Sequence, residues 1–364
     1  MNQLSANSTV RLHNGVEMPL LGLSTEEIAR TIYNLKTQKE LLLDAIEAGF
    51  RFFDTAETHT NIHRALGMAI RESGIPREEF FISSKMRVDE MMDGRYYQAF
   101  EENILQLGTE YLDLYSIHWP AIMNTRWPRY DGYITAFTGR EISKTENGDA
   151  DGLIALYEKG LARAIGVCNY EVHHLKALLA SPLCKVKPMI NQSHFHPLFA
   201  APELRGYCAE NDIAFGGLLE HNELEKPTKP HYFTDVHRLG MRFQTSERAI
   251  RANKIVRVCD GYSNEGFQVD PYRRECNPRA KENYFDDFPA LLAIGKKYGK
   301  TNAQVVTRWS LQHGVVTTSK AARKVKMQET IDVFDFALTE EEMCVIDGLH
   351  AGLRIGYHPD YIDF

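Results

Sequence analysis

Strand-like runs and helical patterns alternate along almost the whole of this 364-residue chain. Eight runs are apolar at most positions, which is typical of parallel strands buried on both faces. They are MPLLGL (18–23), RFFD (51–54), EFFISSK (79–85), YLDLYSIH (111–118), ARAIGV (162–167), PMINQ (188–192), IAFGGL (213–218) and VVTTSK (315–320). Eight β/α units predict an α/β fold of the closed (β/α)8 TIM-barrel type. No GxGxxG turn follows the first strand, which argues against an open dinucleotide-binding sheet.

Helical patterns separate these runs. We expect helices over residues 39–48, 61–73, 96–107, 171–179, 202–210 and 325–334, and one that ends near residue 159. Before the first strand, VRLHNGVEMP (10–19) predicts a β-hairpin around Asn14-Gly15, in a turn whose positive φ angles suit both residues. We expect this hairpin to plug the amino-terminal mouth of the barrel.

One segment breaks the alternation. Residues 219–286, after the seventh strand, are too long for a turn and carry charge clusters and aromatic residues. Long loops of this kind in a compact domain are usually functional lids or disordered. The apolar and aromatic residues favour an ordered lid or a surface for a partner, so we expect a lid or insert there. The chain is otherwise predicted to be a single barrel domain over 1–364, with 349–364 as a C-terminal tail.

Composition narrows the possible partners. The chain has 42 Lys and Arg against 49 Asp and Glu, a net charge of −7, so it offers no broad basic face for nucleic acid. No uncharged apolar run reaches the ~18 residues that span a membrane, and the N-terminus lacks a signal-peptide pattern. The six cysteines show no CxxC spacing. We therefore expect a cytoplasmic protein that binds a small molecule.

The chemistry of such barrels gathers at the carboxyl ends of the strands. The polar residues at those ends are Asp54, His59, Lys85, His118, Asn169, Gln192 and Lys320. His63 follows His59 by about one helical turn, and two such histidines could ligate a divalent metal. Because Lys85 would place a competing cation there, we expect no metal site.

Seven segments resemble the aldo-keto reductases in order and spacing. They are LHNGVEMPLLGLST (12–25), FFDTAETH (52–59), REEFFISSK (77–85), LGTEYLDLYSIHWP (107–120), GLARAIGVCNY (160–170), INQSHFHP (190–197) and VFDFALTEEEMCVIDGL (333–349). The resemblance covers about residues 9–350, apart from the segment after the seventh strand. It implies a (β/α)8 barrel that transfers a hydride from a nicotinamide cofactor, usually NADPH, to an aldehyde or ketone.

The resemblance assigns catalytic roles to four residues. Asp54 and Lys85 match an ion pair that tunes the proton donor, and His118 matches a hydrogen-bond donor to the developing oxyanion. The proton donor of the family is a Tyr, and here that position is His59. Imidazole has an ordinary pKa of about 6.5, and a cationic Lys85 beside it would favour its neutral form. We expect His59 to be an altered acid/base.

The resemblance also implies a weakened NADPH site. Asn169 and Gln192 match residues that hold the nicotinamide carboxamide, and Thr25 matches a position beside the cofactor. Lys320 and Lys326 match a Lys and an Arg that grip the 2′-phosphate, and a Lys in place of an Arg loses the bidentate fork.

Two further residues near these cofactor positions differ from the family pattern. Cys168 and Leu218 replace a Ser and the Tyr that stacks on the nicotinamide ring.

Four residues are candidates for the substrate pocket. Glu26 replaces the family's pocket Trp, and His194 stands where Glu is common. His221 begins the long insert. Trp119 is retained. Two interpretations of it are open: it forms one substrate wall with Tyr115 and the aromatic residues of the insert, or it is a packing residue at the top of the barrel.

Three functions are open from the sequence. The leading one is an NADPH-dependent reductase of an aldehyde or ketone, monomeric by family default, with His59 as its acid/base. The second is a repurposed dehydratase, isomerase or cyclase that uses His59 and His118 as an acid/base pair and has abandoned hydride transfer. The third is a non-catalytic binding subunit that interacts through 219–286, although a scaffold would not need Asp54, Lys85 and His118 together.

Overall fold

The computed structural model describes residues 4–56, 61–87, 90–91, 95–120, 132–139, 152–218, 288–352 and 359. Eight parallel strands close into a barrel in chain order, and the last strand pairs with the first. The strands are β3 (Leu21–Ser24), β4 (Phe52–Asp54), β5 (Phe81–Met86), β6 (Leu114–Ile117), β7 (Ile165–Cys168), β8 (Ile190–His194), β9 (Ala214–Leu218) and β10 (Val316–Lys320). Each predicted run supplies one strand, so the prediction of a (β/α)8 barrel is confirmed.

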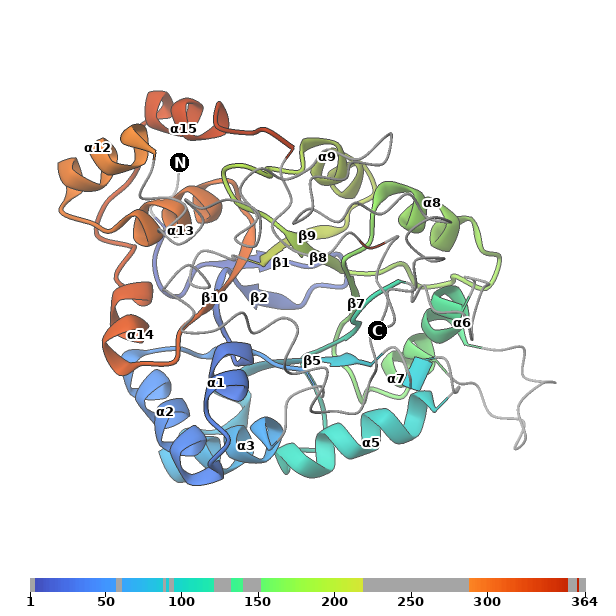
Figure 1. Cartoon of the computed structure of the whole chain (residues 1–364). Coiled ribbons are helices and arrows are strands. Elements are labelled where there is room, and N and C mark those ends of the chain that lie inside the picture. Colours follow the sequence, from blue (N-terminus) through green and yellow to red (C-terminus); the bar gives the residue numbers. More distant parts are fainter. Residues whose placement is uncertain are drawn as a thin grey trace, which may run out of the picture.

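Helices surround the strands as an outer ring (Figure 1). They are α1 (Glu26–Thr31), α2 (Leu35–Ala48), α3 (Ile62–Ser73), the 3-10 helix η1 (Arg77–Glu79), α5 (Tyr96–Leu107), α6 (Gly132–Thr138), α7 (Leu153–Glu158), α8 (Val172–Ala180), α9 (Pro202–Glu210), α12 (Pro289–Tyr298), α13 (Asn302–Gln312), α14 (Lys324–Ile331) and α15 (Glu340–Asp347). None of these described helices is long and apolar enough to cross a membrane.

Most predicted helices are present with small shifts of their ends. The helix expected from residue 39 starts earlier, at Leu35, because the Asn34 side chain accepts a hydrogen bond from the backbone N–H of Thr37 and caps it. Helices α12 and α13, which precede the last strand, were not predicted. The segment 219–286 and residues 353–358 and 360–364 of the tail lie outside the described residues.

A β-hairpin covers the amino-terminal end of the barrel, drawn in blue across the centre of the ring in Figure 1. Its strands are β1 (Thr9–Arg11) and β2 (Glu17–Pro19). Leu12 and Met18 are buried in the main core. The Asn14 amide donates a hydrogen bond of 2.9 Å to the carbonyl of Arg163, which lies just before β7. The prediction of an N-terminal plug is therefore confirmed.

The hairpin turn differs from the predicted one. Only Gly15 has a positive φ angle, 89°, whereas Asn14 does not. The backbone N–H of Gly15 donates to the carbonyl of Leu12, which makes a three-residue loop with glycine at the left-handed position. The Asn14 side chain accepts from the Val16 N–H, a local turn that asparagine forms without a positive φ.

Two helical glycines differ in their surroundings and give a matched pair of substitutions. A Cβ added at Gly67 in α3 would lie 1.9 Å from the Leu107 carbonyl oxygen at the end of α5. A Cβ added at Gly206 in α9 meets no described atom within 4 Å. We expect Gly67→Ala to lower the free energy of unfolding by about 2–3 kcal/mol, because the backbones must separate.

Gly206→Ala serves as the control and should raise the free energy of unfolding by about 0.5–1 kcal/mol, through the higher helix propensity of alanine. Urea unfolding followed by circular dichroism measures both values. The same sign for the two substitutions would contradict the close contact between α3 and α5.

Candidate active site

Asp54 and Lys85 form a buried ion pair at the carboxyl ends of the neighbouring strands β4 and β5. The Lys85 Nζ lies 2.7 Å from each carboxylate oxygen of Asp54 and 3.1 Å from the Thr55 carbonyl oxygen. The Ser83 hydroxyl also donates to Asp54 Oδ1. Only 3% of Asp54 and 4% of Lys85 is exposed. The ammonium group is therefore fixed in place, and its charge is balanced by the carboxylate.

His118 follows β6 at the same end of the barrel. Its backbone N–H donates to the Met86 carbonyl, and its own carbonyl accepts from the Asn169 side-chain amide at 3.0 Å. His118 and Trp119 are half-buried, with ring centroids 6.1 Å apart. The structure thus places a partly accessible imidazole on the strand next to Lys85.

Asn169 and Gln192 meet at the ends of the adjacent strands β7 and β8. Asn169 has a φ angle of 63°, in the left-handed region that asparagine tolerates better than most residues. Its backbone N–H donates to the Gln192 carbonyl at 2.7 Å. The Asn169 Oδ1 is buried without a hydrogen-bond partner among the described residues. Gln192 is also buried, and its Oε1 lies 3.4 Å from the Cys168 Sγ.

Cys168 lies beneath this site, close enough to Asp54 and Lys85 for electrostatic interaction. Burial raises the pKa of its thiol to about 12, while the charge of Lys85 acts in the opposite direction. A thiol with this pKa remains protonated at neutral and mildly alkaline pH. It is therefore not a nucleophile under those conditions, because the thiolate is the reactive form.

We expect iodoacetamide at about pH 9 to leave Cys168 unmodified in the folded protein, because its thiol is both protonated and buried. The exposed Cys344 should be alkylated in the same sample and serves as an internal control. Peptide mass mapping reads the two sites separately. Alkylation of Cys168 at the rate of Cys344 would show that the site is open to solvent.

Thr25 and Lys320 lie where β3 and β10 close the barrel. The Thr25 backbone N–H donates to the Asp54 carbonyl, and its buried Oγ1 has no partner among the described residues. Lys320 ends β10 and is buried, with its Nζ 2.9 Å from Glu26 Oε2. Lys326, in α14, lies 3.0 Å from Glu329 Oε2. Both lysines expected to hold a phosphate therefore face carboxylates of this chain.

The structure shows the surroundings of His194 and Tyr115, two of the residues predicted to line the substrate pocket. His194 ends β8 and is almost fully buried. Tyr115 packs edge-on against Phe100 of α5, with ring centroids 5.2 Å apart, so the prediction that it joins Trp119 in a substrate wall is wrong. The cause is strand alternation, which turns this side chain of β6 toward the outer helices.

Of the candidate histidines His59, His63 and His221, the structure describes only His63. His63 lies 3.2 Å from the Ser84 hydroxyl, and that hydroxyl donates to Asn103 of α5, so His63 belongs to the layer between barrel and helices. His59 and His221 lie outside the described residues. Within the described residues, no group of three or more His, Cys, Asp or Glu side chains is arranged to hold a metal ion.

A second polar cluster, not predicted, lies at the opposite end of the barrel. Asp113 is fully buried just before β6 and accepts hydrogen bonds from Arg77 at 2.8 Å, Arg163 at 2.6 Å and the Ile82 backbone at 2.9 Å. In the sequence this residue is the Asp of the LDLY segment (112–115). That Asp stands at the amino end of its strand, whereas the residues selected above stand at the carboxyl ends.

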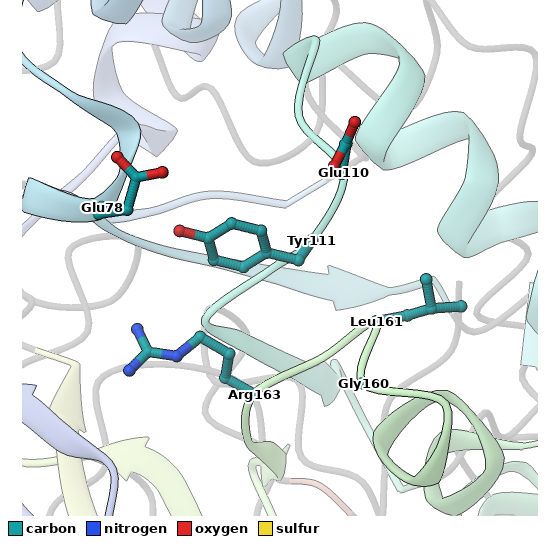
Figure 2. A pocket seen from close by; sticks show the side chains of 6 residues that line it. All are labelled: Glu78, Glu110, Tyr111, Gly160, Leu161 and Arg163. Atoms are coloured by element: carbon teal, nitrogen blue, oxygen red, sulfur yellow. The ribbon is translucent and has the colours of Figure 1, made fainter.

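An open hollow of about 620 Å³ adjoins this cluster (Figure 2). Its lining residues are Glu78, Glu110, Tyr111, Gly160, Leu161 and Arg163. The Arg77 guanidinium packs over the Tyr111 ring, 4.3 Å from its centroid. Partial burial raises the pKa of the Tyr111 phenol. Because the hollow lies at the amino ends of the strands, it is separate from the candidate active site.

Comparison with known proteins agrees with this fold. The profile of the Aldo/keto reductase family matches residues 20–351. Glyoxal reductase of Bacillus subtilis (strain 168) is 33% identical over 360 residues, which cover 99% of each chain. The 9,11-endoperoxide prostaglandin H2 reductase of Trypanosoma cruzi (strain CL Brener) is 35% identical, over 96% of this chain and 94% of its own.

A solved structure gives the same relationship. MGS-M4, an aldo-keto reductase enzyme from a Medee basin deep-sea metagenome library, has a TM-score of 0.67 and 26% identity, over 98% of this chain and 100% of its own. A family profile that spans most of the chain, relatives at about one-third identity over nearly full length and a shared barrel all agree. The chain therefore belongs to the aldo/keto reductase family.

Proposed function

We propose that the protein is an NADPH-dependent oxidoreductase that reduces the aldehyde or ketone group of a small metabolite. The observation that carries the proposal is the buried Asp54–Lys85 pair, held one strand away from the half-buried imidazole of His118. Family membership supports an oxidoreductase that acts on carbonyl compounds. One relative is named for the reduction of glyoxal, which makes a small aldehyde a reasonable first substrate to test.

The residues around β7, β8 and β10 fit a nicotinamide cofactor. The buried Oδ1 of Asn169, unpartnered among the described residues, is an acceptor of the kind that the NH₂ of a carboxamide requires. Gln192 adds a second amide beside it, and Lys320 adds a buried cation suited to a phosphate. When bound, the cofactor would supply the hydride.

The protein's own task is to stabilise the charge that develops on the carbonyl oxygen. We assign His118 the role of hydrogen-bond donor to that oxygen, and its partial accessibility at the barrel mouth supports this role. Lys85, fixed by both oxygens of Asp54, keeps a positive charge beside the mouth without a mobile side chain. In this proposal His59 is the altered acid/base beside the carbonyl oxygen, and Trp119 packs against the substrate.

NADPH binding and turnover test the proposal together. We expect calorimetry to detect NADPH binding and absorbance to show NADPH oxidation in the presence of glyoxal. His59→Ala should lower kcat by about a hundredfold, because a general acid contributes at least that factor, and should leave the NADPH Kd unchanged.

His59→Tyr, which restores the family's proton donor, is the matched variant and should retain reduction. Absence of binding of both NADPH and NADH at millimolar concentration would contradict the proposal. Turnover of a substrate without any nicotinamide would favour the non-redox acid/base alternative.

A further inference from the structure

Glu26 and Lys320 form an ion pair at the seam where β10 closes on β3. Lys320 lies opposite Ser24 in the strand register, and Glu26 starts the helix that follows, α1. The Lys320 Nζ lies 2.9 Å from Glu26 Oε2. The two side chains differ in solvent contact, since Lys320 is 6% exposed and Glu26 is 33% exposed. The buried ammonium therefore already has an anionic partner from this chain.

The Glu26 carboxylate has a second cationic neighbour. Its Oε1 lies 3.5 Å from the Arg30 Nη1, one turn further along α1. If Lys320 bound another anion, Glu26 would keep this neighbour and its contact with solvent. Lys320 is buried and depends more strongly on an anionic partner, because an uncompensated buried charge is costly. Lys320 can therefore exchange the Glu26 carboxylate for another anion.

Lys326 shows the same arrangement. Its Nζ lies 3.0 Å from Glu329 Oε2 within α14, and the Glu329 side chain is 20% exposed. Both lysines that the family resemblance places at the 2′-phosphate of NADPH are therefore paired with carboxylates. An anionic phosphate that enters this site must replace existing charge pairs and gains less than it would from unpaired lysines.

We infer that Glu26 determines the cofactor preference of this site by competing with the 2′-phosphate of NADPH for Lys320. This inference rests on the proposed function. NADH lacks the 2′-phosphate and does not require the exchange, so the protein should discriminate only weakly between the two cofactors. Removal of the Glu26 charge should strengthen NADPH binding selectively, because only the phosphate uses the lysine that becomes available.

Dissociation constants for NADPH and NADH, measured by quenching of intrinsic fluorescence, test the inference without turnover. We expect Glu26→Gln to lower the NADPH Kd roughly threefold to tenfold, a range that reflects the partial exposure of the carboxylate, and to leave the NADH Kd within about twofold. Glu27→Gln removes the same charge from the next residue of α1 and is the matched control. It should leave the ratio of the two constants unchanged.

Adenosine 2′,5′-bisphosphate and AMP give a second readout that contains no nicotinamide. Glu26→Gln should strengthen binding of the bisphosphate and leave AMP unaffected. Lys320→Met should remove this effect, so that Glu26→Gln has no further influence in the double variant.

The outcomes separate the two proposals. If the wild type binds both cofactors and Glu26→Gln leaves the ratio of their constants unchanged, the inference about Glu26 is wrong and the proposed function stands. If neither cofactor binds to the wild type or to the variant, both are wrong. Binding of NADPH by the variant alone would support the inference.

Discussion

Lys85→Met is expected to lower kcat for carbonyl reduction by about a hundredfold to a thousandfold, with NADPH still bound. The reason lies in the geometry of the pair. Lys85 is the cation that balances Asp54, and its ammonium is held by three oxygen atoms. Methionine fills a similar volume without charge or hydrogen-bond donors. Single-turnover measurements at saturating NADPH would isolate the chemical step from cofactor binding.

Stability must be separated from catalysis in this test. Removal of Lys85 leaves Asp54 buried without its cation, and loss of one partner of a buried pair costs about 3–5 kcal/mol of unfolding free energy. The double variant Lys85→Met/Asp54→Asn removes both charges and should recover much of that stability while remaining inactive. Activity of either variant within threefold of wild type would show that the pair has no catalytic role.

Asp113→Ala should lower the free energy of unfolding by about 3–5 kcal/mol, as much as the loss of Lys85. This carboxylate accepts hydrogen bonds from Arg77, Arg163 and the Ile82 backbone N–H, and is fully buried. The substitution would leave the largely buried Arg77 without its ion-pair partner and a backbone donor without an acceptor. Urea denaturation measures the change.

Arg163→Ala is the matched control for Asp113. The Arg163 side chain is 47% exposed, so its ion pair with Asp113 should contribute about 1 kcal/mol or less. Neither substitution should alter the NADPH Kd of the folded protein, because the cluster lies at the opposite end of the strands. A decrease in unfolding free energy below about 1 kcal/mol for Asp113→Ala would contradict the expectation that this buried carboxylate stabilises the amino end of the barrel.

The barrel was predictable because every buried parallel strand leaves an apolar run that stands out from its amphipathic neighbours. Chain order then placed Asp54, Lys85, His118, Asn169 and Gln192 at one end, and the structure brings Asp54 to Lys85 and Asn169 to both His118 and Gln192. Position at or near the carboxyl end of each strand sufficed to predict that these residues lie at the same end of the barrel.

Pairings between distant segments were not predictable in the same way. The expected place of Glu26 in the substrate pocket stays a prediction, but its contact with Lys320 was not predicted; it arises because barrel closure brings the first and last strands together. Asp113 pairs with Arg77 of η1 and with Arg163, which lies just before β7. Such contacts depend on which side chains meet when the barrel closes. The hydrophobic periodicity of the sequence does not contain this information. Likewise, Tyr115 is an aromatic residue of the kind that lines binding pockets, but its side chain faces the outer helices.

The hairpin that covers the amino-terminal end also constrains the order of events in the proposed reaction. Since the interior of such a barrel is filled by side chains, and Leu12 and Met18 cover its far end, reactants approach Asp54 and Lys85 from one direction. Two molecules that share a single entrance cannot pass each other. If the nicotinamide lies deeper, against Asn169 and Gln192 as proposed, it must arrive first and depart last, and the architecture then favours an ordered kinetic sequence.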